Sequence, residues 1–198
     1  MLTKVFVSVF ALSLLLVPAW AGEDESTEKE VPAKTQEVAK PAPAQPDVSV
    51  KEAEPFFALV LPMKGSYGQH TAGIDQLMAY AKTLRLEPPE FVFGQYFNNP
   101  MQVKEEELLW EVGIPLPDGT EVEAPYVAKT IPGGSVVYAI HIGPYEESST
   151  LWPAIYMWAG MNGYQPSGPA MEIWSGDPQK TGEEGPTTEL RAPVTKPE

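Results

Sequence analysis

Hydrophobic and polar residues alternate with the period of a β-strand in stretches that occur as two pairs. The first pair is FVFGQYF (91–97) and LLWEVGIPL (108–116), and the second is AMEIWSG (170–176) and TTELRAPV (187–194). Side chains of a strand point alternately to its two faces, so each stretch predicts a strand with at least one apolar face. The pattern also predicts two shorter strands ahead of each pair, at about 47–53 and 56–63 and at about 125–131 and 135–142.

Between the predicted strands, apolar residues recur at helical spacing. One stripe consists of Ile74, Leu77, Met78, Ala81 and Leu84, and a second of Trp152, Ile155, Tyr156 and Ala159. This spacing predicts two amphipathic helices, near 72–85 and 149–162. Gly65 and Gly143 stand before these helices, where a turn from strand into helix calls for positive φ.

The second half of the chain repeats the first. Residues 47–117 align with residues 125–195 at a constant offset of 78 and without a gap. The identical pairs include Lys51 with Lys129, Gly65 with Gly143, Tyr67 with Tyr145 and Glu111 with Glu189. A repeat of this length indicates a duplicated subdomain rather than a solenoid unit.

Together these patterns predict an α+β domain over residues 47–195, followed by a short tail at 196–198. Its duplicated β-α-β-β modules, 47–117 and 125–195, are expected to be related by pseudo-two-fold symmetry. We expect an antiparallel sheet with two helices on one face and a ligand groove on the other.

The alternation also predicts which side chains line that groove. If Trp110, Phe93 and Leu190 face the helices, their neighbours along the strands face away from them. The helix-free face would then carry Glu111, Glu189, Glu172, Tyr96 and Trp174. Aromatic walls with a carboxylate suit a flat, apolar or cationic ligand. The alternative is that Glu189 is a solvated strand residue, or that Arg191 pairs with it and cancels its charge.

The N-terminus has the features of a secretory signal peptide. Lys4 precedes an apolar run at 5–17, and AWA supplies small residues before a cleavage site between Ala21 and Gly22. The alternative is an uncleaved membrane anchor, but the run is short for a membrane span. Residues 22–46, rich in Pro, Ala, Glu and Lys, predict a disordered tether. We therefore expect a periplasmic or secreted protein without stable membrane insertion after cleavage.

Charge and composition narrow the classes of partner. The formal net charge of −14 argues against binding nucleic acid and favours cationic or neutral ligands. The absence of cysteine excludes disulfides, thiol catalysis and cysteine-bound metals. His70 and His141 are the only histidines, and no metal motif accompanies them. We therefore predict neither a metal nor another cofactor.

The second module carries a further signature. It consists of Gly-Pro-Tyr (143–145), two spaced tryptophans (152 and 158), Gly-Tyr (163–164), an aromatic strand ending in Asp-Pro (177–178), and Thr-Glu-Leu before Pro-Val (188–194). This order resembles the GyrI-like small-molecule-binding domain, also called the AraC-type effector-binding domain. The resemblance covers most of residues 47–195. It implies a duplicated fold and a groove for lipophilic cations, with Glu189 as the groove carboxylate. No helix-turn-helix precedes the domain, so transcription control is not expected.

The leading interpretation is an exported protein that binds a small amphipathic, aromatic or cationic molecule through Glu189, Glu111, Tyr96, Trp174, Tyr138 and Tyr145. For Tyr145, which follows the Gly-Pro turn, an anchoring role at the helix entry is the alternative. A second interpretation is a hydrolase of small electrophiles, with Glu189 as base and Tyr96 or Tyr138 as donor. A haem-binding protein ranks last, because neither histidine is expected in the groove.

Overall fold

The computed structural model describes residues 46–176 and 185–197. The predicted signal peptide (1–21) and the tether up to residue 45 lie outside these residues, as does the last residue of the predicted tail. Within the described part of the chain, no helix is long and apolar enough to cross a membrane.

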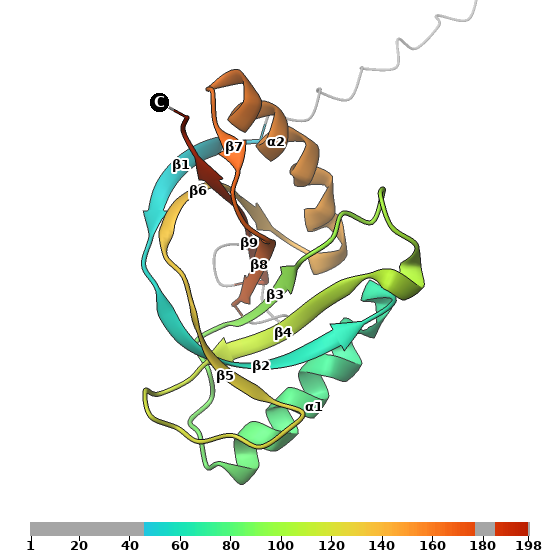
Figure 1. Ribbon diagram of the computed structural model, residues 1–198, viewed down its shortest axis with the longest axis vertical. Helices are drawn as coiled ribbons and strands as arrows, with labels where there is room; N and C mark the ends of the chain where they lie inside the picture. The colour runs from blue at the N-terminus through green and yellow to red at the C-terminus, as the bar shows by residue number, and fades with distance from the viewer. Residues whose placement is uncertain (1–45, 177–184, 198) are drawn as a thin grey trace, which may run out of the picture. The chain divides into compact units, whose positions relative to one another are not determined.

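The described chain forms two successive sets of strands and one main helix each (Figure 1). The first set is β1 (Val48–Ala53), β2 (Phe56–Lys64), the 3-10 turn η1 (Tyr67–Gln69), α1 (His70–Thr83), β3 (Val92–Tyr96), the turn η2 (Glu105–Glu107) and β4 (Leu109–Pro115). The second set is β5 (Val127–Ile131), β6 (Gly134–Ile142), the 3-10 segment η3 (Tyr145–Leu151), α2 (Trp152–Met161), the short β7 (Gln165–Pro166), β8 (Ala170–Ser175) and β9 (Thr187–Thr195). The predicted strands and both predicted helices are present.

All main strands join one antiparallel sheet in the order β1-β6-β9-β8-β3-β4-β2-β5, and β7 pairs with the C-terminal end of β9, at Val194 and Thr195. The strands that correspond in the two modules are β1 and β5, β2 and β6, β3 and β8, and β4 and β9. When each strand is replaced by its counterpart, the same order is obtained, read from the opposite edge of the sheet. The sheet therefore has a pseudo-two-fold axis at its centre, between β3 and β8, and the α+β architecture predicted from the sequence is confirmed.

Equivalent backbone bonds repeat in the two modules. The N–H of Gly65 donates to the carbonyl of Leu108 at 2.9 Å, and the N–H of Gly143 donates to the carbonyl of Pro186 at the same distance. Both glycines have positive φ, 93° and 138°, as the strand-to-helix turn requires. The turn between strand and helix is thus built in the same way in both copies.

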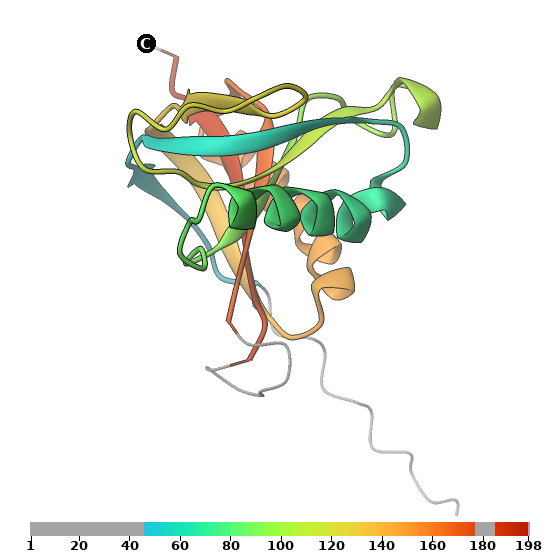
Figure 2. The ribbon, with the colours of Figure 1, turned by 90° about the horizontal axis from the view of Figure 1, so that it is seen from below.

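Each helix covers its own module on the same side of the sheet (Figures 1 and 2). Under α1 lies a core that includes Leu77, Trp110 and Val112, all at most 1% exposed. Under α2 the corresponding core includes Ile155 and Leu190, both fully buried. Neither helix covers the part of this sheet face that lies between them, and a cavity opens there.

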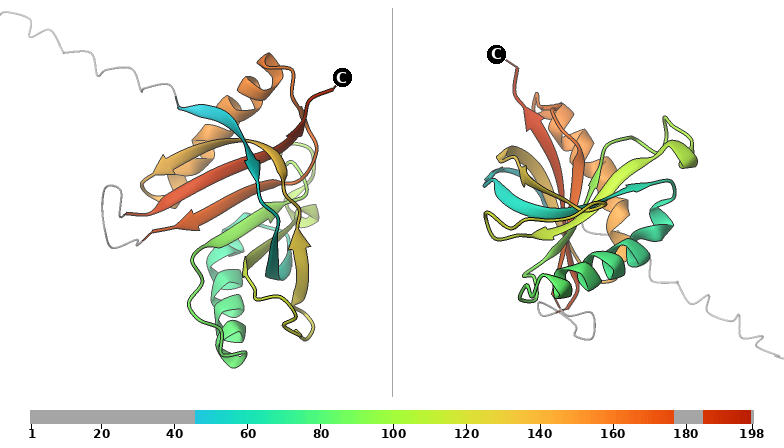
Figure 3. Two further views of the ribbon diagram at one scale, coloured as in Figure 1. Left: turned by 90° about the vertical axis from the view of Figure 1, so that its left-hand side faces the viewer. Right: turned by 60° about the horizontal axis from the view of Figure 1, so that its bottom comes forward.

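The helix-free face of the sheet has an apolar core of its own. Its buried members are Ala58, Val60, Phe93, Ile131, Met171 and Ile173. They are buried without a helix because the sheet bends: β1 runs on into β2 and β5 into β6, and these bent pairs cross (Figure 3). At the crossing, a Cβ on Gly133 would lie 2.4 Å from the carbonyl oxygen of Ala53, so only glycine fits there. Both faces of the central strands are consequently apolar.

Candidate functional site: a cavity between the two helices

A cavity of about 1270 Å³ opens on the helix-bearing side of the sheet. Its floor is formed by β3 and β8, and its walls by the N-terminal parts of the two helices with the segments that precede them. This volume is large enough for a drug-sized ligand. The groove predicted on the helix-free face is therefore on the opposite side of the sheet.

The cavity floor lies on the pseudo-two-fold axis. Strands β3 and β8 pair so that Gly94 stands directly opposite Glu172, and these two residues are repeat mates. A Cβ on Gly94 would lie 2.6 Å from Cη2 of Trp174 and 2.9 Å from the hydroxyl of Tyr96. At the axis, the second module thus has the carboxylate of Glu172. The first module has Gly94, whose missing side chain leaves room for the rings of Trp174 and Tyr96.

Glu172 is the buried carboxylate of the cavity, with 9% of its surface exposed. Its Oε1 accepts a hydrogen bond from Nε1 of Trp152 at 3.1 Å, and its Oε2 accepts one from the hydroxyl of Tyr96 at 3.2 Å. Burial raises the pKa of Glu172, and hydrogen bonds from Trp152, Tyr96 and Trp174 lower it by a smaller amount. Among the described residues, no lysine or arginine pairs with Glu172.

His70 extends this hydrogen-bonded chain. Its Nε2 lies 3.0 Å from the hydroxyl of Tyr96, so the chain runs from His70 through Tyr96 to Glu172. Burial lowers the pKa of His70, and a hydrogen bond with the backbone of Tyr67 raises it by less. The pKa of the Tyr96 hydroxyl is raised, chiefly by burial and then by the charge of Glu172. Tyr96 therefore acts here as a neutral hydroxyl.

Aromatic rings surround the chain. The ring centre of His70 lies 4.5 Å from that of Trp110 and 5.4 Å from that of Trp174. Tyr67 and Tyr96 pack edge to face with centres 5.0 Å apart. Farther out, the lining includes the apolar side chains Phe91, Phe97, Met101 and Tyr156. Rings at several orientations offer π-faces to an aromatic or cationic guest.

The lining is acidic as well as apolar. Three carboxylates contribute to it, from Glu90, Glu146 and Glu172, and the lining includes no lysine or arginine among the described residues. The described residues likewise contain no cluster of three or more side chains suited to a metal ion. The electrostatic character of the cavity therefore favours positive charge.

Three of the side chains predicted to bind a ligand line the cavity. Tyr96 and Trp174 stand on its floor, on either side of the axis. Tyr145 lies in the wall, and its hydroxyl donates to the carbonyl of Ser175 at 3.4 Å, which ties the start of η3 to the end of β8. Tyr145 thus has an anchoring contact as well as a place in the lining.

The other three predicted side chains, Glu189, Glu111 and Tyr138, lie on the helix-free face. Glu189 is paired with Lys51 at 2.5 Å and with Nε of Arg191 at 2.7 Å. The ring of Tyr138 lies below Lys51, whose Nζ is 4.3 Å from the ring centre. The prediction that Glu189 joins Tyr96 and Trp174 in one groove is wrong, and Arg191 neutralises Glu189 as the alternative held.

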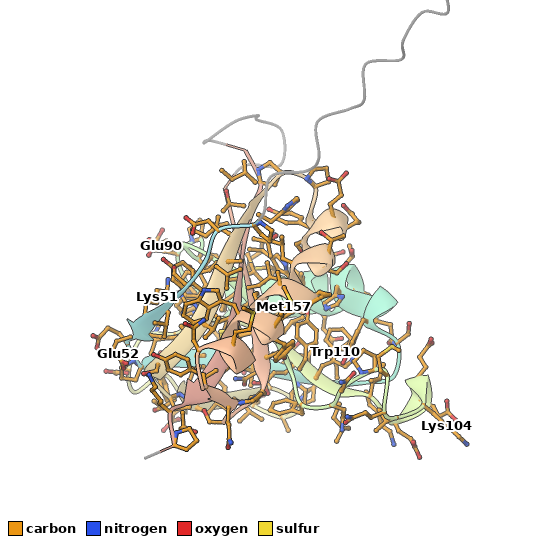
Figure 4. All side chains as sticks on the ribbon, turned by 90° about the horizontal axis from the view of Figure 1, so that it is seen from above. Lys51, Glu52, Glu90, Lys104, Trp110 and Met157 are labelled. Atoms are coloured by element: carbon orange, nitrogen blue, oxygen red, sulfur yellow. The ribbon has the colours of Figure 1, made fainter. Side chains whose placement is uncertain are left out.

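Glu111 forms the equivalent pair in the first module. Its Oε1 lies 2.6 Å from Nζ of Lys129. Lys129 is the repeat mate of Lys51, and Glu111 that of Glu189, so the two pairs are related by the pseudo-two-fold axis. In Figure 4, Lys51 and Trp110 lie toward opposite sides of the domain. These identities between the copies maintain matched ion pairs on the helix-free face.

The wrong assignment of faces has a physical cause. Tyr96 pairs across the strands with Trp110 and shares its helix-facing side, whereas Phe93 pairs with Gly113 and faces the other way. Alternation alone cannot tell these faces apart when both are apolar, because only the register between strands relates them. The third core described above creates this ambiguity.

Trp152 and His70 were not predicted as site residues, and Glu172 was predicted on the groove face but not among the ligand-binding residues. A signal for Glu172 exists in the sequence, since it stands two residues before Trp174 on the same strand and must share its face. His70 offers no such signal, because its place depends on where η1 ends and α1 begins. The histidine-free groove expected from the sequence is therefore corrected.

The sequence of this cavity-bearing domain matches a known family. The GyrI-like small molecule binding domain is matched over residues 46–195. The chain belongs to this GyrI-like family. The match spans both modules and the cavity between them, so the resemblance inferred from the sequence is confirmed. No protein with a curated description matches the chain.

Solved structures share the GyrI-like fold at low sequence identity. The C-terminal domain of EcmrR is 18% identical with a TM-score of 0.65, covering 77% of this chain and 99% of that one. In the EcmrR–DNA complex, the chain matches at 19% identity and TM-score 0.65, covering 77% of itself but only 59% of EcmrR. A hydrolase encoded by lin2189 from Listeria innocua has 16% identity, TM-score 0.56 and coverages of 76% and 93%. SAV2435 bound to tetraphenylphosphonium has 12% identity, TM-score 0.51 and coverages of 75% and 94%.

Proposed function

We propose that this GyrI-like domain binds a lipophilic cation carrying aromatic rings, with Glu172 as the counter-charge. The observation that supports this most is a buried carboxylate at the centre of an aromatic cavity, with no lysine or arginine partner in the described part of the chain. A buried charge is costly unless it is paired, and a ligand cation can supply the missing partner. SAV2435, a structure of the same fold, is bound to such a cation, tetraphenylphosphonium.

Size and rings support the same class of ligand. The cavity of about 1270 Å³ accommodates several aromatic rings, and Trp152, Trp174 and Tyr96 present ring surfaces near the carboxylate. A desolvated cation over such rings gains about 2 kcal/mol or more in favourable cases. Glu189 and Glu111, already paired with cations on the other face, are not required for binding.

The test compares two probes of one shape and opposite charge, tetraphenylphosphonium and tetraphenylborate. Binding at pH 8 is measured by calorimetry and by quenching of tryptophan fluorescence. We expect the cation to bind at least about tenfold more tightly than the anion, because an unpaired carboxylate at a few ångström discriminates by more than 1.4 kcal/mol. Glu172→Gln keeps the side-chain shape and should remove most of this preference.

Glu189→Gln is the matched control, since it removes a carboxylate of the same type from the opposite face. It should leave both affinities within about twofold of the wild type. Equal binding of the two probes to the wild type, or equal loss of cation binding in both variants, would contradict the proposal.

A second candidate function is hydrolysis of a small electrophile. The observation that favours it is the hydrogen-bonded chain of Glu172, Tyr96 and His70, in which a carboxylate, a hydroxyl and an imidazole can move protons. Glu172 would be the base, since Glu189 and Tyr138 lie on the other face. Formation of diol from styrene oxide, lost in Glu172→Gln, would support this candidate, and absence of turnover in the wild type would count against it.

We also propose that the domain acts after export. The support is the apolar run at 5–17 followed by AWA, which lies outside the described residues. Mass spectrometry of the exported protein should find a chain that starts at Gly22. A protein that still begins at Met1 and sediments with membranes would indicate an anchor.

A further inference from the structure

The proton positions in the cavity follow from the geometry of one hydroxyl. Tyr96 has a single proton and lies within hydrogen-bond distance of both Glu172 and His70. When Glu172 is charged it can only accept, so Tyr96 donates to Glu172 and must accept from His70. His70 Nε2 therefore carries a hydrogen in this state. A neutral ring has no second N–H, so the hydrogen bond to the backbone of Tyr67, which raises the pKa of His70, is fully made only when the imidazole is charged. The imidazole and the carboxylate are coupled through one shared group.

His70 is also the only lining side chain, among the described residues, that can gain a positive charge near neutral pH. Nε2 of His70 and Oε2 of Glu172 are at most about 6 Å apart, since both hydrogen-bond the same hydroxyl. Direct ring neighbours of His70 are Tyr67 from η1, Tyr96 from β3, Trp110 from β4 and Trp174 from β8. The other titratable groups of the lining are Glu90, Glu146, Tyr145 and Tyr156.

Building on the proposed function, we propose that His70 is the specificity-determining residue of the cavity, a proton-controlled charge that competes with the ligand for Glu172. As a neutral imidazole, His70 leaves the carboxylate without a cation, and the cavity takes a lipophilic cation. After taking up a proton, the imidazolium provides that positive charge internally. The cavity then releases lipophilic cations and accepts lipophilic anions more readily.

The pH range follows from the environment of the ring. Because burial lowers the pKa of His70, the neutral form prevails above the ordinary value of 6.5 and the charged form appears only below it. His70 should thus add little to the pH dependence of cation binding between pH 8 and pH 7, and its protonation should weaken cation binding on further acidification. Protonation of Glu172 acts in the same direction, so the contribution of His70 must be separated by substitution.

The first experiment measures tetraphenylphosphonium and tetraphenylborate binding from pH 8 to pH 5 for the wild type and for His70→Gln. Gln donates a hydrogen bond to Tyr96 but does not titrate. In the wild type, the ratio of cation to anion affinity should fall at least about tenfold over this range, as expected for one added charge within a few ångström. In His70→Gln the ratio should change by less than half as much on a logarithmic scale. An unchanged pH dependence in His70→Gln would overturn the proposal.

The second experiment observes the imidazole itself. The chain has two histidines, so the proton resonances of the rings are assigned by comparing the wild type with His70→Gln. Tetraphenylphosphonium should lower the pKa of His70 and tetraphenylborate should raise it, since binding and protonation are linked. His141 hydrogen-bonds the carbonyl of Pro144 outside the cavity and provides a reference resonance that should not respond to ligand.

The outcomes separate this proposal from the proposed function. Tight cation binding at pH 8 with a ligand-independent His70 titration would retain the proposed function and reject the role of His70. Absence of cation binding at pH 8 would reject the proposed function itself. A shift of the His70 and His141 resonances together would indicate a global change rather than a charge beside the ligand, and would also reject the role of His70.

Discussion

The two faces of this sheet hold buried or half-buried carboxylates in opposite situations. On the helix-free face, Glu189 and Glu111 are paired with lysines, and Glu189 also with Arg191. On the helix-bearing face, the described residues offer Glu172 neutral donors, from Trp152, Tyr96 and Trp174, and no lysine or arginine. The carboxylates of the helix-free face are neutralised by basic side chains of the protein itself. The carboxylate of Glu172 is not, so a positively charged ligand can neutralise it.

The pKa shifts of Glu189 and Glu172 have opposite signs, whereas the pKa of Glu111 is raised because burial outweighs the effect of Lys129. Burial raises the pKa of Glu189, but Arg191 and Lys51 outweigh this effect and the pKa is lowered overall. Burial raises the pKa of Glu172 and its neutral donors do not compensate for it. Residue type and burial are therefore insufficient to identify a binding carboxylate. Among the described residues, a basic partner is present for Glu189 and Glu111 and absent for Glu172.

The largest effect on stability is expected on the helix-free face. Glu189→Gln leaves Lys51 and Arg191 without their partner and should lower the free energy of unfolding by about 2 kcal/mol, less than for a fully buried pair because Lys51 reaches solvent. Urea denaturation at pH 7.5 measures this change. The exposed Glu54→Gln is the control and should alter stability by less than about 0.5 kcal/mol. Equal stability of Glu189→Gln and wild type would remove the structural role of this pair.

A methyl group on the cavity floor should act on binding. In Gly94→Ala the new Cβ would lie 2.6 Å from Cη2 of Trp174, so the indole must move into the cavity. We expect tetraphenylphosphonium affinity to fall about tenfold, equivalent to 1.4 kcal/mol. Gly160→Ala on α2, where a Cβ meets nothing within 4 Å, is the matched control and should leave affinity unchanged. Unaltered affinity in Gly94→Ala would mean that the ligand does not use the floor.

Removing the unpaired charge should stabilise the fold. Because the pKa of Glu172 is raised, the charged carboxylate lowers the free energy of unfolding at neutral pH. Glu172→Gln removes this charge, and the carbonyl oxygen of the glutamine can still accept the hydrogen bond from Trp152. The expected result is a melting temperature about 2–4 °C higher at pH 7.5. A lower melting temperature would place Glu172 with Glu189 as a structural carboxylate and would erase the contrast between the faces.

The smallest effects are opposite pH dependences. The lowered pKa of Glu189 contributes stability that is present above pH 4.5 and lost as the pH falls through the folded-state pKa. The raised pKa of Glu172 gives a penalty that is present at neutral pH and relieved as the pH falls toward 4.5. The stability difference between wild type and Glu172→Gln should therefore shrink on mild acidification, before the Glu189→Gln difference shrinks. Parallel pH profiles would contradict both assignments.

The sequence predicted the elements and their duplication because periodicity and the offset of 78 residues are local or linear signals. Strands, helices and the turn glycines Gly65 and Gly143 follow from such signals. The face of β3 and β8 that meets the helices does not, since Phe93 and Tyr96 are both large and both at least partly buried. That choice is made by strand register, which is a long-range property.

The candidate site residues also divide into those that local signals predict and those that depend on strand register. Tyr96, Trp174 and Tyr145 could be predicted as lining residues from aromatic type and repeat position. Glu189 was predicted from its face of the strand and from the family resemblance, yet it and its repeat mate Glu111 form ion pairs with Lys51 and Lys129 on the other face. Identity between the copies at these positions thus indicates shared architecture, whereas the proposed binding carboxylate, Glu172, stands where the copies differ.

The pairing of Gly94 with Glu172 has a consequence for how such a site can arise. In a dimer of identical single modules, a residue on the symmetry axis meets its own copy, so this position would hold two glutamates side by side or two glycines. Neither arrangement places one carboxylate beside one open position. In a single chain the two modules can differ at the axis, and here they do, so that one carboxylate and the space opposite it lie at the centre of the cavity floor.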